Sequence, residues 1–313
     1  MTGEAILAAR VDSDAGEPAV DALTAARAVL PRLPCPSAAV MTGTPPPWAG
    51  TLLDQFDVVV STEAELAPIL EAAHSTPLAA MALVQLLRQN AGLDIHQGLI
   101  AESLVYSTLQ SGPELGRWLA ERPARPARRQ EPEPAVLVRR HEQRLRLTLN
   151  RPARHNAFCA AMRDALAEGL QIAVCDPSIA EVLIDGAGPS FCSGGDLDEF
   201  GTLPDPATAH AIRSTRNPGR LLAACADRAR FALHGACVGA GVELAAFARR
   251  VVAAEDAFFQ LPEVAMGLVP GAGGTVSLPR RIGRQRTAEL ALSGRRLDAA
   301  TALRWGLFDE LRG

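Results

Sequence analysis

A stretch rich in proline, arginine and glutamate divides this chain into two unequal parts. It covers residues 122–134 and reads RPARPARRQEPEP. Proline lacks the backbone N–H that helix and sheet ladders need, and such densely spaced charges cannot be buried in a core. We therefore expect a solvated linker over residues 122–135, with separately folded segments on either side.

The part before the linker is predicted to contain two segments. Residues 1–62 show short apolar runs separated by an alanine-rich helical stretch, and the run at residues 57–60 is rich in β-branched valine. This pattern indicates a small α/β segment. Residues 63–121 carry apolar side chains at three- and four-residue spacing, which predicts a helical module. The remaining residues, 136–313, are expected to form the core.

Strand and helix patterns alternate after the linker, which favours a layered α/β fold. Leu145, Leu147 and Leu149 alternate with polar residues, as in a half-buried strand. A helical stretch follows at residues 157–174. Further strands are predicted at residues 179–184, 230–233, 250–253 and 258–261, and further helices at 241–247 and 285–293.

Composition narrows the function classes. The net charge of −4 gives no broad attraction to nucleic acid or to anionic membranes, and lysine is absent, which excludes a lysine Schiff base and a Walker-type phosphate loop. The six cysteines form no C-x-x-C pair and lie at no zinc-site spacing. We therefore expect no metal site and interpret the scattered cysteines as reduced core residues of a cytoplasmic protein. Neither a leader pattern nor an apolar run of about 18 residues is found, so no membrane span is expected.

Three glycine-rich segments carry the candidate chemistry. They read FCSGGDL at residues 191–197, HGACVGAGVELA at 234–245 and QLPEVAMGLVPGAGGT at 260–275. Glycine lets the backbone approach a ligand closely, and the N–H groups at a helix start carry partial positive charge. Two such sites facing each other would form an oxyanion hole. Asp196 follows the first glycine pair and is interpreted as a helix cap.

Two glutamates accompany these segments. Glu243 is expected in the first turn of a helix, and Glu263 follows Pro262 at a second strand-to-helix junction. Either one alone would more often be a helix-end carboxylate favoured by the dipole. Together, beside two backbone donors, they suit acid–base chemistry next to a carbonyl. The histidines 155, 210 and 234 and the cysteines 192 and 237 are interpreted as structural.

The order and spacing of these segments resemble the crotonase (enoyl-CoA hydratase/isomerase) superfamily. The matching patterns are F-x-x-G-x-D-L, H-G-x-x-x-G-x-G-x-E-L-A and P-E-x-x-x-G-L-x-P-G-A-G-G-T, preceded by N-R-P-x-x-x-N-A at residues 150–157. The resemblance covers about residues 136–311. It implies an α/β fold in which ββα turns form a spiral, with an additional, mostly helical N-terminal region.

By the same resemblance, the N–H groups of Gly195 and Ala240 form the oxyanion hole, and Glu243 and Glu263 are the catalytic glutamates. The implied reaction adds water across the 2,3 double bond of an enoyl-CoA. Both glutamates would hold the attacking water, and Glu263 would deliver the proton. The resemblance assigns the surroundings of coenzyme A to Arg154, His155, Ala157, Ser193, Gly194, Asp196, Leu197, Gly239 and Pro262.

The resemblance also implies the partners. Coenzyme A would enter only as part of an acyl-CoA or enoyl-CoA substrate, with no separate cofactor, and the chain would form a homo-oligomer, either a trimer or a hexamer. Neither nucleic acid nor a membrane is expected as a partner. Two alternatives stay open: another crotonase-type reaction (isomerisation, thioester hydrolysis or oxygenase-type chemistry), or a non-catalytic CoA-binding or assembly subunit, suggested by departures from the pattern at Arg249 and Asp198.

One further expectation concerns the front half of the chain. In crotonases the core is followed by helices that cover the acyl pocket. Residues 56–66, 75–102 and 112–122 resemble those helices, although here they come before the core. We consider a circular-permutation-like arrangement and, as its rival, a decayed tandem repeat over residues 20–122. Both hypotheses place the helices of residues 63–121 over the core.

Overall fold

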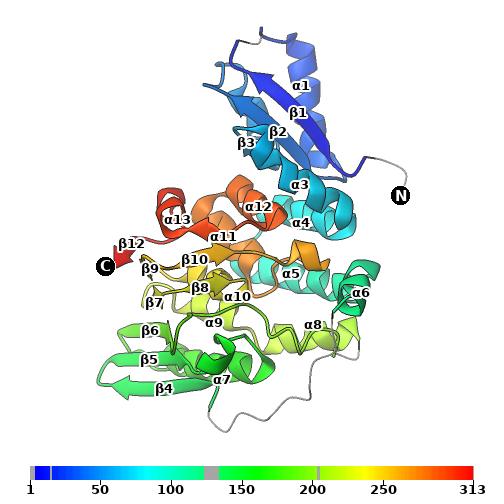
Figure 1. Ribbon diagram of the computed structural model, residues 1–313. Coiled ribbons are helices and arrows are strands. Elements are labelled where there is room, and N and C mark those ends of the chain that lie inside the picture. Colours follow the sequence, from blue (N-terminus) through cyan, green and yellow to red (C-terminus); the bar gives the residue numbers. More distant parts are fainter. Residues whose placement is uncertain (1–3, 15, 123–133, 203–204, 313) are drawn as a thin grey trace.

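The computed structural model describes residues 4–14, 16–122, 134–202 and 205–312, so most of the predicted linker lies outside the described residues. The largest sheet of the core has six strands in the order β12-β9-β7-β6-β5-β4 (Figure 1). β4 and β5 pair antiparallel and the other neighbours are parallel. Its strands are β4 (Val136–His141), β5 (Arg144–Leu149), β6 (Glu181–Gly186), β7 (Ala229–Leu233), β9 (Arg250–Ala254) and β12 (Glu310–Arg312).

A smaller sheet and several helices complete the core. The smaller sheet has the order β11-β10-β8, in which β8 (Ala236–Val238) and β10 (Phe258–Gln260) are parallel and β11 (Leu297–Asp298) is antiparallel. The α-helices are α7 (Ala160–Cys175), α8 (Pro206–Thr215), α9 (Pro218–Ala224), α10 (Ala240–Glu243), α11 (Gly274–Ile282), α12 (Arg284–Ser293) and α13 (Ala299–Trp305). The 3₁₀ turns are η2 (Pro152–Arg154), η3 (Ala245–Phe247) and η4 (Val264–Met266). The sequence patterns did not predict α8, α9, α11 or α13.

The first residues form a separate parallel sheet of three strands, β1 (Leu7–Asp12), β2 (Ser37–Thr42) and β3 (Val58–Val60). It packs with α1 (Val20–Val29), η1 (Leu30–Arg32) and α2 (Gly50–Leu53). The β-branched side chains at residues 58–60 suit a strand, and Val58 and Val60 are buried. The α/β pattern of this part of the sequence is therefore present in the fold.

Four helices follow the small sheet: α3 (Glu63–Ser75) and α4 (Pro77–Asn90) lie next to it, whereas α5 (Ile95–Gln110) and α6 (Pro113–Ala120) lie beside the core (Figure 1). Capping boxes at Thr62 and Asp94 define the starts of α3 and α5. α4 and α5 pack on α11, α3 packs on α12, and α5 packs on α8 and α9. The helices thus lie over the core, as both hypotheses about their origin require. No helix among the described residues is long and apolar enough to cross a membrane.

A buried ionic junction joins the small sheet to the rest of the molecule. The Asp57 side chain is 1% exposed and accepts hydrogen bonds from Ser37 in β2, from Arg88 Nε in α4 at 2.9 Å and from Arg284 Nη1 in α12 at 2.8 Å. Gln285 adds a bond from its Nε2 to the Leu53 carbonyl oxygen at 2.7 Å. One carboxylate therefore ties together three parts of the chain that are distant in sequence.

We expect Asp57→Asn to lower the free energy of unfolding by about 3 kcal/mol, because it leaves two largely buried guanidinium groups without their counter-charge. Urea unfolding followed by circular dichroism measures the loss. The matched control is Glu310→Gln, which breaks the exposed ion pair with Arg250 and should leave the unfolding midpoint unchanged. Equal midpoints for the wild-type and Asp57→Asn proteins would contradict the role given to this junction.

Candidate active site

A cavity of about 480 Å³ lies where the N-terminal helices meet the core. The predicted residues Gly195, Ala240, Glu243 and Glu263 all line it. Helix α5 supplies part of the opposite wall through Leu99, Glu102, Ser103, Tyr106 and Gln110. The site is therefore built jointly from residues encoded before and after the linker.

Two of the glycine-rich segments run side by side at this cavity. Cys192 N donates to the Ala236 carbonyl oxygen and Val238 N donates to that of Cys192, both at 2.9 Å. A Cβ placed on Gly239, where φ is +50°, would come within 3.5 Å of Gly194 Cα, so the two backbones approach closely.

The contact brings the two predicted oxyanion donors to the same cavity. Among the hydrogen bonds of the described residues, neither Gly195 N nor Ala240 N donates to an acceptor in the chain. Ala240 is also the first residue of α10, where N–H groups have no partner within the helix. Both N–H groups are thus available to a ligand oxygen.

Glu243 is buried at the end of α10 and is held by backbone donors. Its Oε2 accepts hydrogen bonds from Ala272 N at 2.7 Å and from Gly274 N at 2.9 Å. Burial raises the pKa of Glu243 to about 7, although these two N–H groups act in the opposite direction. A carboxylate with a pKa close to neutral pH is suited to accept a proton from water.

Glu263 differs from Glu243 because its side chain has an unsatisfied oxygen. Oε2 is buried without a hydrogen-bond partner, and Oε1 lies so close to Gly239 that a Cβ there would be 2.4 Å away. Burial, followed by the charge of Glu243, raises the pKa of Glu263 well above its ordinary value. Glu263 therefore holds a proton more readily than an ordinary glutamate and is suited to act as a proton donor.

A third glutamate, Glu102 in α5, was not predicted from the sequence. Its Oε1 accepts from Gly273 N at 2.7 Å, and its Oε2 accepts from Thr275 N at 2.9 Å and from Thr275 Oγ1 at 2.6 Å. Burial and the charge of Glu243 raise the pKa of Glu102 to about 8. The one available signal in the sequence was a single acidic residue on the face of α5 that also carries Leu99 and Leu109, both buried.

The residues expected around coenzyme A occupy the turns beside this cavity, and of these Asp196 alone lines it. Asp196 is wrong as a helix cap: the residues after it form turns, and its carboxylate instead pairs with Arg151 Nη1 at 2.9 Å, with both side chains buried. The same Arg151 Nη1 donates to the Ala157 carbonyl oxygen at 2.5 Å. This buried ion pair holds the backbone at Asp196, directly after Gly195.

The other candidates support the same turns. Arg154 pairs with Asp198, the acidic residue noted as a departure from the family pattern. His155 has a left-handed backbone with φ at +50°, and its carbonyl oxygen accepts from Ser193 N at 2.9 Å. The Leu197 carbonyl oxygen accepts from Arg122 Nη1 at 2.7 Å. Gly194 and Gly239 form the close backbone contact, and Pro262 directly precedes Glu263.

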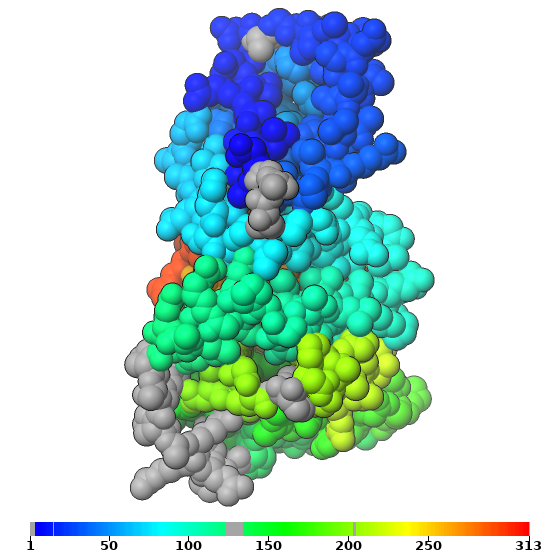
Figure 2. All heavy atoms as spheres, turned by 90° about the vertical axis from the view of Figure 1, so that its right-hand side faces the viewer, coloured from blue at the N-terminus to red at the C-terminus, as the bar shows by residue number. Residues whose placement is uncertain are grey.

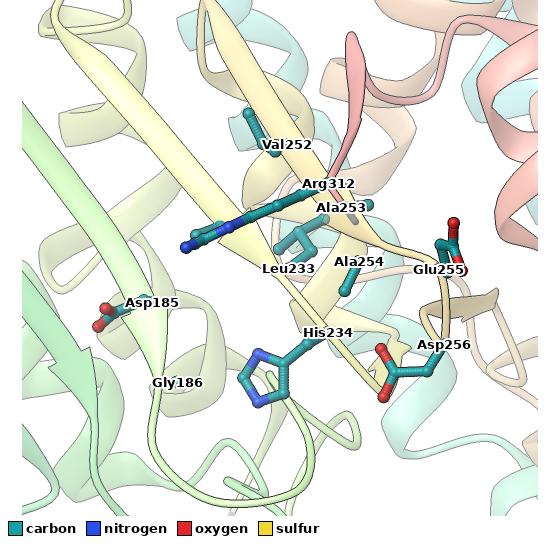
Figure 3. A pocket seen from close by; sticks show the side chains of 11 residues that line it. Asp185, Gly186, Leu233, His234, Val252, Ala253, Ala254, Glu255, Asp256 and Arg312 are labelled. Carbon is teal, nitrogen blue, oxygen red and sulfur yellow. The ribbon is translucent and has the colours of Figure 1, made fainter.

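A second cavity, of about 510 Å³, lies at the ends of strands β6, β7 and β9 (Figure 3). Asp185, His234, Asp256 and Arg312 are among the residues around it, and His234 Nε2 lies 2.9 Å from the Gly188 carbonyl oxygen. None of the predicted catalytic or CoA-binding residues lines this cavity. Throughout the described part of the chain, no group of three or more His, Cys, Asp or Glu side chains is placed to hold a metal ion.

We expect the burial of Glu102 to make stability depend on pH. Its pKa rises from an ordinary value of 4.5 to about 8 on folding, so the folded state binds the proton more tightly. That contribution is complete below pH 4.5 and is lost as the pH rises through about 8. Glu102→Gln should therefore flatten the fall in the urea midpoint between these pH values.

The control for lost hydrogen bonds is Glu114→Gln, because Glu114 accepts from Leu78 N and Ala79 N at the start of α4. If the urea midpoint of Glu102→Gln falls with pH as steeply as that of the wild-type protein, the Glu102 carboxyl takes up no proton on folding, and the expectation is wrong.

The chain matches the family model described as enoyl-CoA hydratase/isomerase over residues 140–312. It is 37% identical over 176 residues to 2,3-dehydroadipyl-CoA hydratase of Escherichia coli K12, covering 56% of this chain and 68% of that protein. It is 40% identical over 165 residues to 1,2-epoxyphenylacetyl-CoA isomerase of the same organism, covering 51% and 63%. The matched region thus spans about two thirds of the length of these relatives.

Solved structures show the same likeness. An enoyl-CoA hydratase of Thermoplasma volcanium superposes with a TM-score of 0.53 at 32% identity, over 57% of this chain and 72% of that chain. A Thermobifida fusca protein solved in complex with acetoacetyl-CoA gives 0.52 at 27% identity, over 57% and 73%. With the family model, these matches confirm the crotonase-like α/β fold that the motifs predicted. The chain belongs to the enoyl-CoA hydratase/isomerase family.

Proposed function

We propose that this protein hydrates the 2,3 double bond of an enoyl-CoA. One observation carries the proposal: Glu243 and Glu263 are both buried at a single cavity that also exposes the two unengaged N–H groups of Gly195 and Ala240. An enoyl thioester needs both elements, because negative charge develops on its carbonyl oxygen while water attacks C3.

The two glutamates would divide the proton transfers. Glu243, as a carboxylate, accepts a proton from the water whose oxygen forms the new bond to C3. The electron pair of the double bond moves toward the thioester, and the oxygen is held by Gly195 N–H and Ala240 N–H. Glu263, with its raised pKa, donates its proton to C2 as the enolate collapses. The product is a 3-hydroxyacyl-CoA, and one proton transfer from Glu243 to Glu263 restores the starting state.

The surroundings of the reaction form part of the same proposal. Coenzyme A would enter with the substrate and pass the turns of Arg154–Ala157 and Ser193–Leu197, and no separate cofactor would take part. The Thermobifida fusca structure in complex with acetoacetyl-CoA supports this choice of ligand. We also propose a cytoplasmic enzyme that assembles as a homotrimer or a hexamer.

Isomerisation is the second candidate, because the relative with 40% identity is an isomerase. The same oxyanion donors would serve it, while the glutamates would move a proton within the substrate and no water would be added. The two reactions differ in their products. A hydratase yields a 3-hydroxyacyl-CoA from crotonyl-CoA, whereas an isomerase leaves the mass of its substrate unchanged.

We expect Glu243→Gln and Glu263→Gln each to lower kcat for crotonyl-CoA hydration by about 10²-fold or more, because each removes one proton-transfer group. The loss of ultraviolet absorbance of the conjugated thioester measures the rate. The control is Glu168→Gln on the exposed face of α7, which should match the wild-type rate. Glutamine variants that turn over as fast as the parent would exclude the mechanism with two glutamates.

The activity should also fall at acidic pH. Glu243 must be ionised to accept the proton of water, and its pKa is raised to about 7. We therefore expect kcat/KM to decrease as the pH drops below about 7, with one proton taken up. A profile that stays flat down to pH 5 would contradict the assignment of Glu243 as the base.

A further inference from the structure

Helix α8 brings an arginine to the wall of the active-site cavity. Arg213 lines the cavity together with Tyr106 and Gln110 of the facing helix α5. Its guanidinium stacks over the Tyr106 ring, 4.5 Å from the centroid. Tyr106 in turn packs on Gly271, where a Cβ would lie 2.3 Å from the ring. Gly271 belongs to the loop whose Ala272 and Gly274 hold Glu243. Arg213 is thus separated from that loop by one aromatic ring.

The positive charge of Arg213 has no ionic partner. Its Nη2 donates to Ser107 Oγ at 2.8 Å and to Gln110 Oε1 at 2.7 Å, and both acceptors are neutral. Its Nε is buried without a hydrogen-bond partner. In the part of the chain that the structure describes, no carboxylate lies within ion-pair distance of this guanidinium.

Two other arginines at the same cavity differ in this respect. Arg163 pairs with Asp164 at 2.8 Å, and Arg216 pairs with Glu168 at 3.2 Å. Burial lowers the pKa of Arg213, yet a guanidinium stays charged at neutral pH. A partly buried cation without a carboxylate at ion-pair distance is unfavourable, and a ligand that brings an anion to it relieves this penalty.

The wall around Arg213 is polar where α5 meets α8. Ser103 Oγ lies 2.9 Å from His210 Nδ1, so the two helices also meet through a second polar pair. Figure 2 shows α8 directly beneath the N-terminal helices on this face of the molecule. A straight hydrocarbon tail would bring no counter-charge to Arg213, whereas an acyl chain that ends in a carboxylate would.

We propose that Arg213 binds a carboxylate at the far end of the acyl chain, so that the preferred substrates are short enoyl-CoA thioesters of dicarboxylic acids. This inference rests on the proposed function, whose cavity it uses. Because Nη2 already donates to Ser107 and Gln110, the carboxylate would accept a charge-assisted hydrogen bond from Nη1 of the guanidinium. Tyr106 supports the face of the guanidinium and thereby sets the plane in which the carboxylate is held.

The test compares two thioesters of equal chain length, trans-2-hexenedioyl-CoA and trans-2-hexenoyl-CoA. We expect the wild-type protein to have the higher kcat/KM for the diacid. Arg213→Met should lower kcat/KM for the diacid by about 30-fold or more and leave that for the monoacid nearly unchanged. Arg213→Lys keeps the positive charge but lacks the planar guanidinium, and should show an intermediate preference for the diacid.

The matched control is Arg216→Met, which removes an arginine of the same cavity that already has a carboxylate partner. It should retain the wild-type preference for the diacid. If Arg213→Met lowers kcat/KM equally for both thioesters, Arg213 acts on a part that they share, such as the phosphates of coenzyme A, and the proposal is wrong. A wild-type protein with equal kcat/KM for the two thioesters would also overturn it.

Binding of the saturated analogues adipyl-CoA and hexanoyl-CoA, measured by calorimetry, separates this inference from the proposed reaction. The inference is supported if the wild-type protein binds adipyl-CoA more tightly and Arg213→Met abolishes this preference. If the same protein does not hydrate crotonyl-CoA, only the proposed reaction is refuted. Equal affinity for both analogues overturns the inference but does not bear on the proposed reaction, which the crotonyl-CoA assay tests separately. Thermal unfolding of each variant confirms that it is folded, and Arg213→Lys provides the test if Arg213→Met is not.

Discussion

Four successive backbone N–H groups at the start of α11 are shared alternately by two buried carboxylates. Ala272 and Gly274 donate to Glu243, while Gly273 and Thr275 donate to Glu102. A helix start favours negative charge, but the charge of Glu243 opposes ionisation of Glu102 and contributes to its raised pKa. The position of the proposed base and the attachment of the N-terminal helices to the core therefore depend on the same turn. Asn90 reinforces it by donating to the Thr275 carbonyl oxygen.

The core could be predicted well because it is encoded by local sequence patterns, namely glycine-rich motifs and the periodicity of apolar residues. The glycine patterns at residues 191–197 and 234–245 must approach each other as backbones, and the structure joins them by backbone hydrogen bonds. Periodicity placed the main strands within about two residues of their positions. Helix α8 was missed because Ile212 is the one large apolar residue in its sequence PATAHAIRST, and Ala209 is its one buried residue.

The site was only partly predictable for a different reason. Gly195, Ala240, Glu243 and Glu263 lie in motifs of their own, so their roles could be inferred without knowing the tertiary contacts. Glu102 and Arg213 become meaningful only through partners that are about 170 and 100 residues away in the chain. No local pattern encodes such contacts. Asp196 shows the opposite error, because a motif suggested a helix cap where a buried ion pair with Arg151 was needed.

The order of the segments also affects how the molecule is made. Asn90 and Thr275 are 185 positions apart, and α4, whose Leu83, Leu86 and Leu87 are buried, packs on α11 and α12, which are encoded near the end. At translation rates of roughly 5–20 residues per second, this apolar face waits about 10–40 s for its partner. Because helices α3–α6 are translated before the core, they must stay soluble until the core on which they pack has been synthesised.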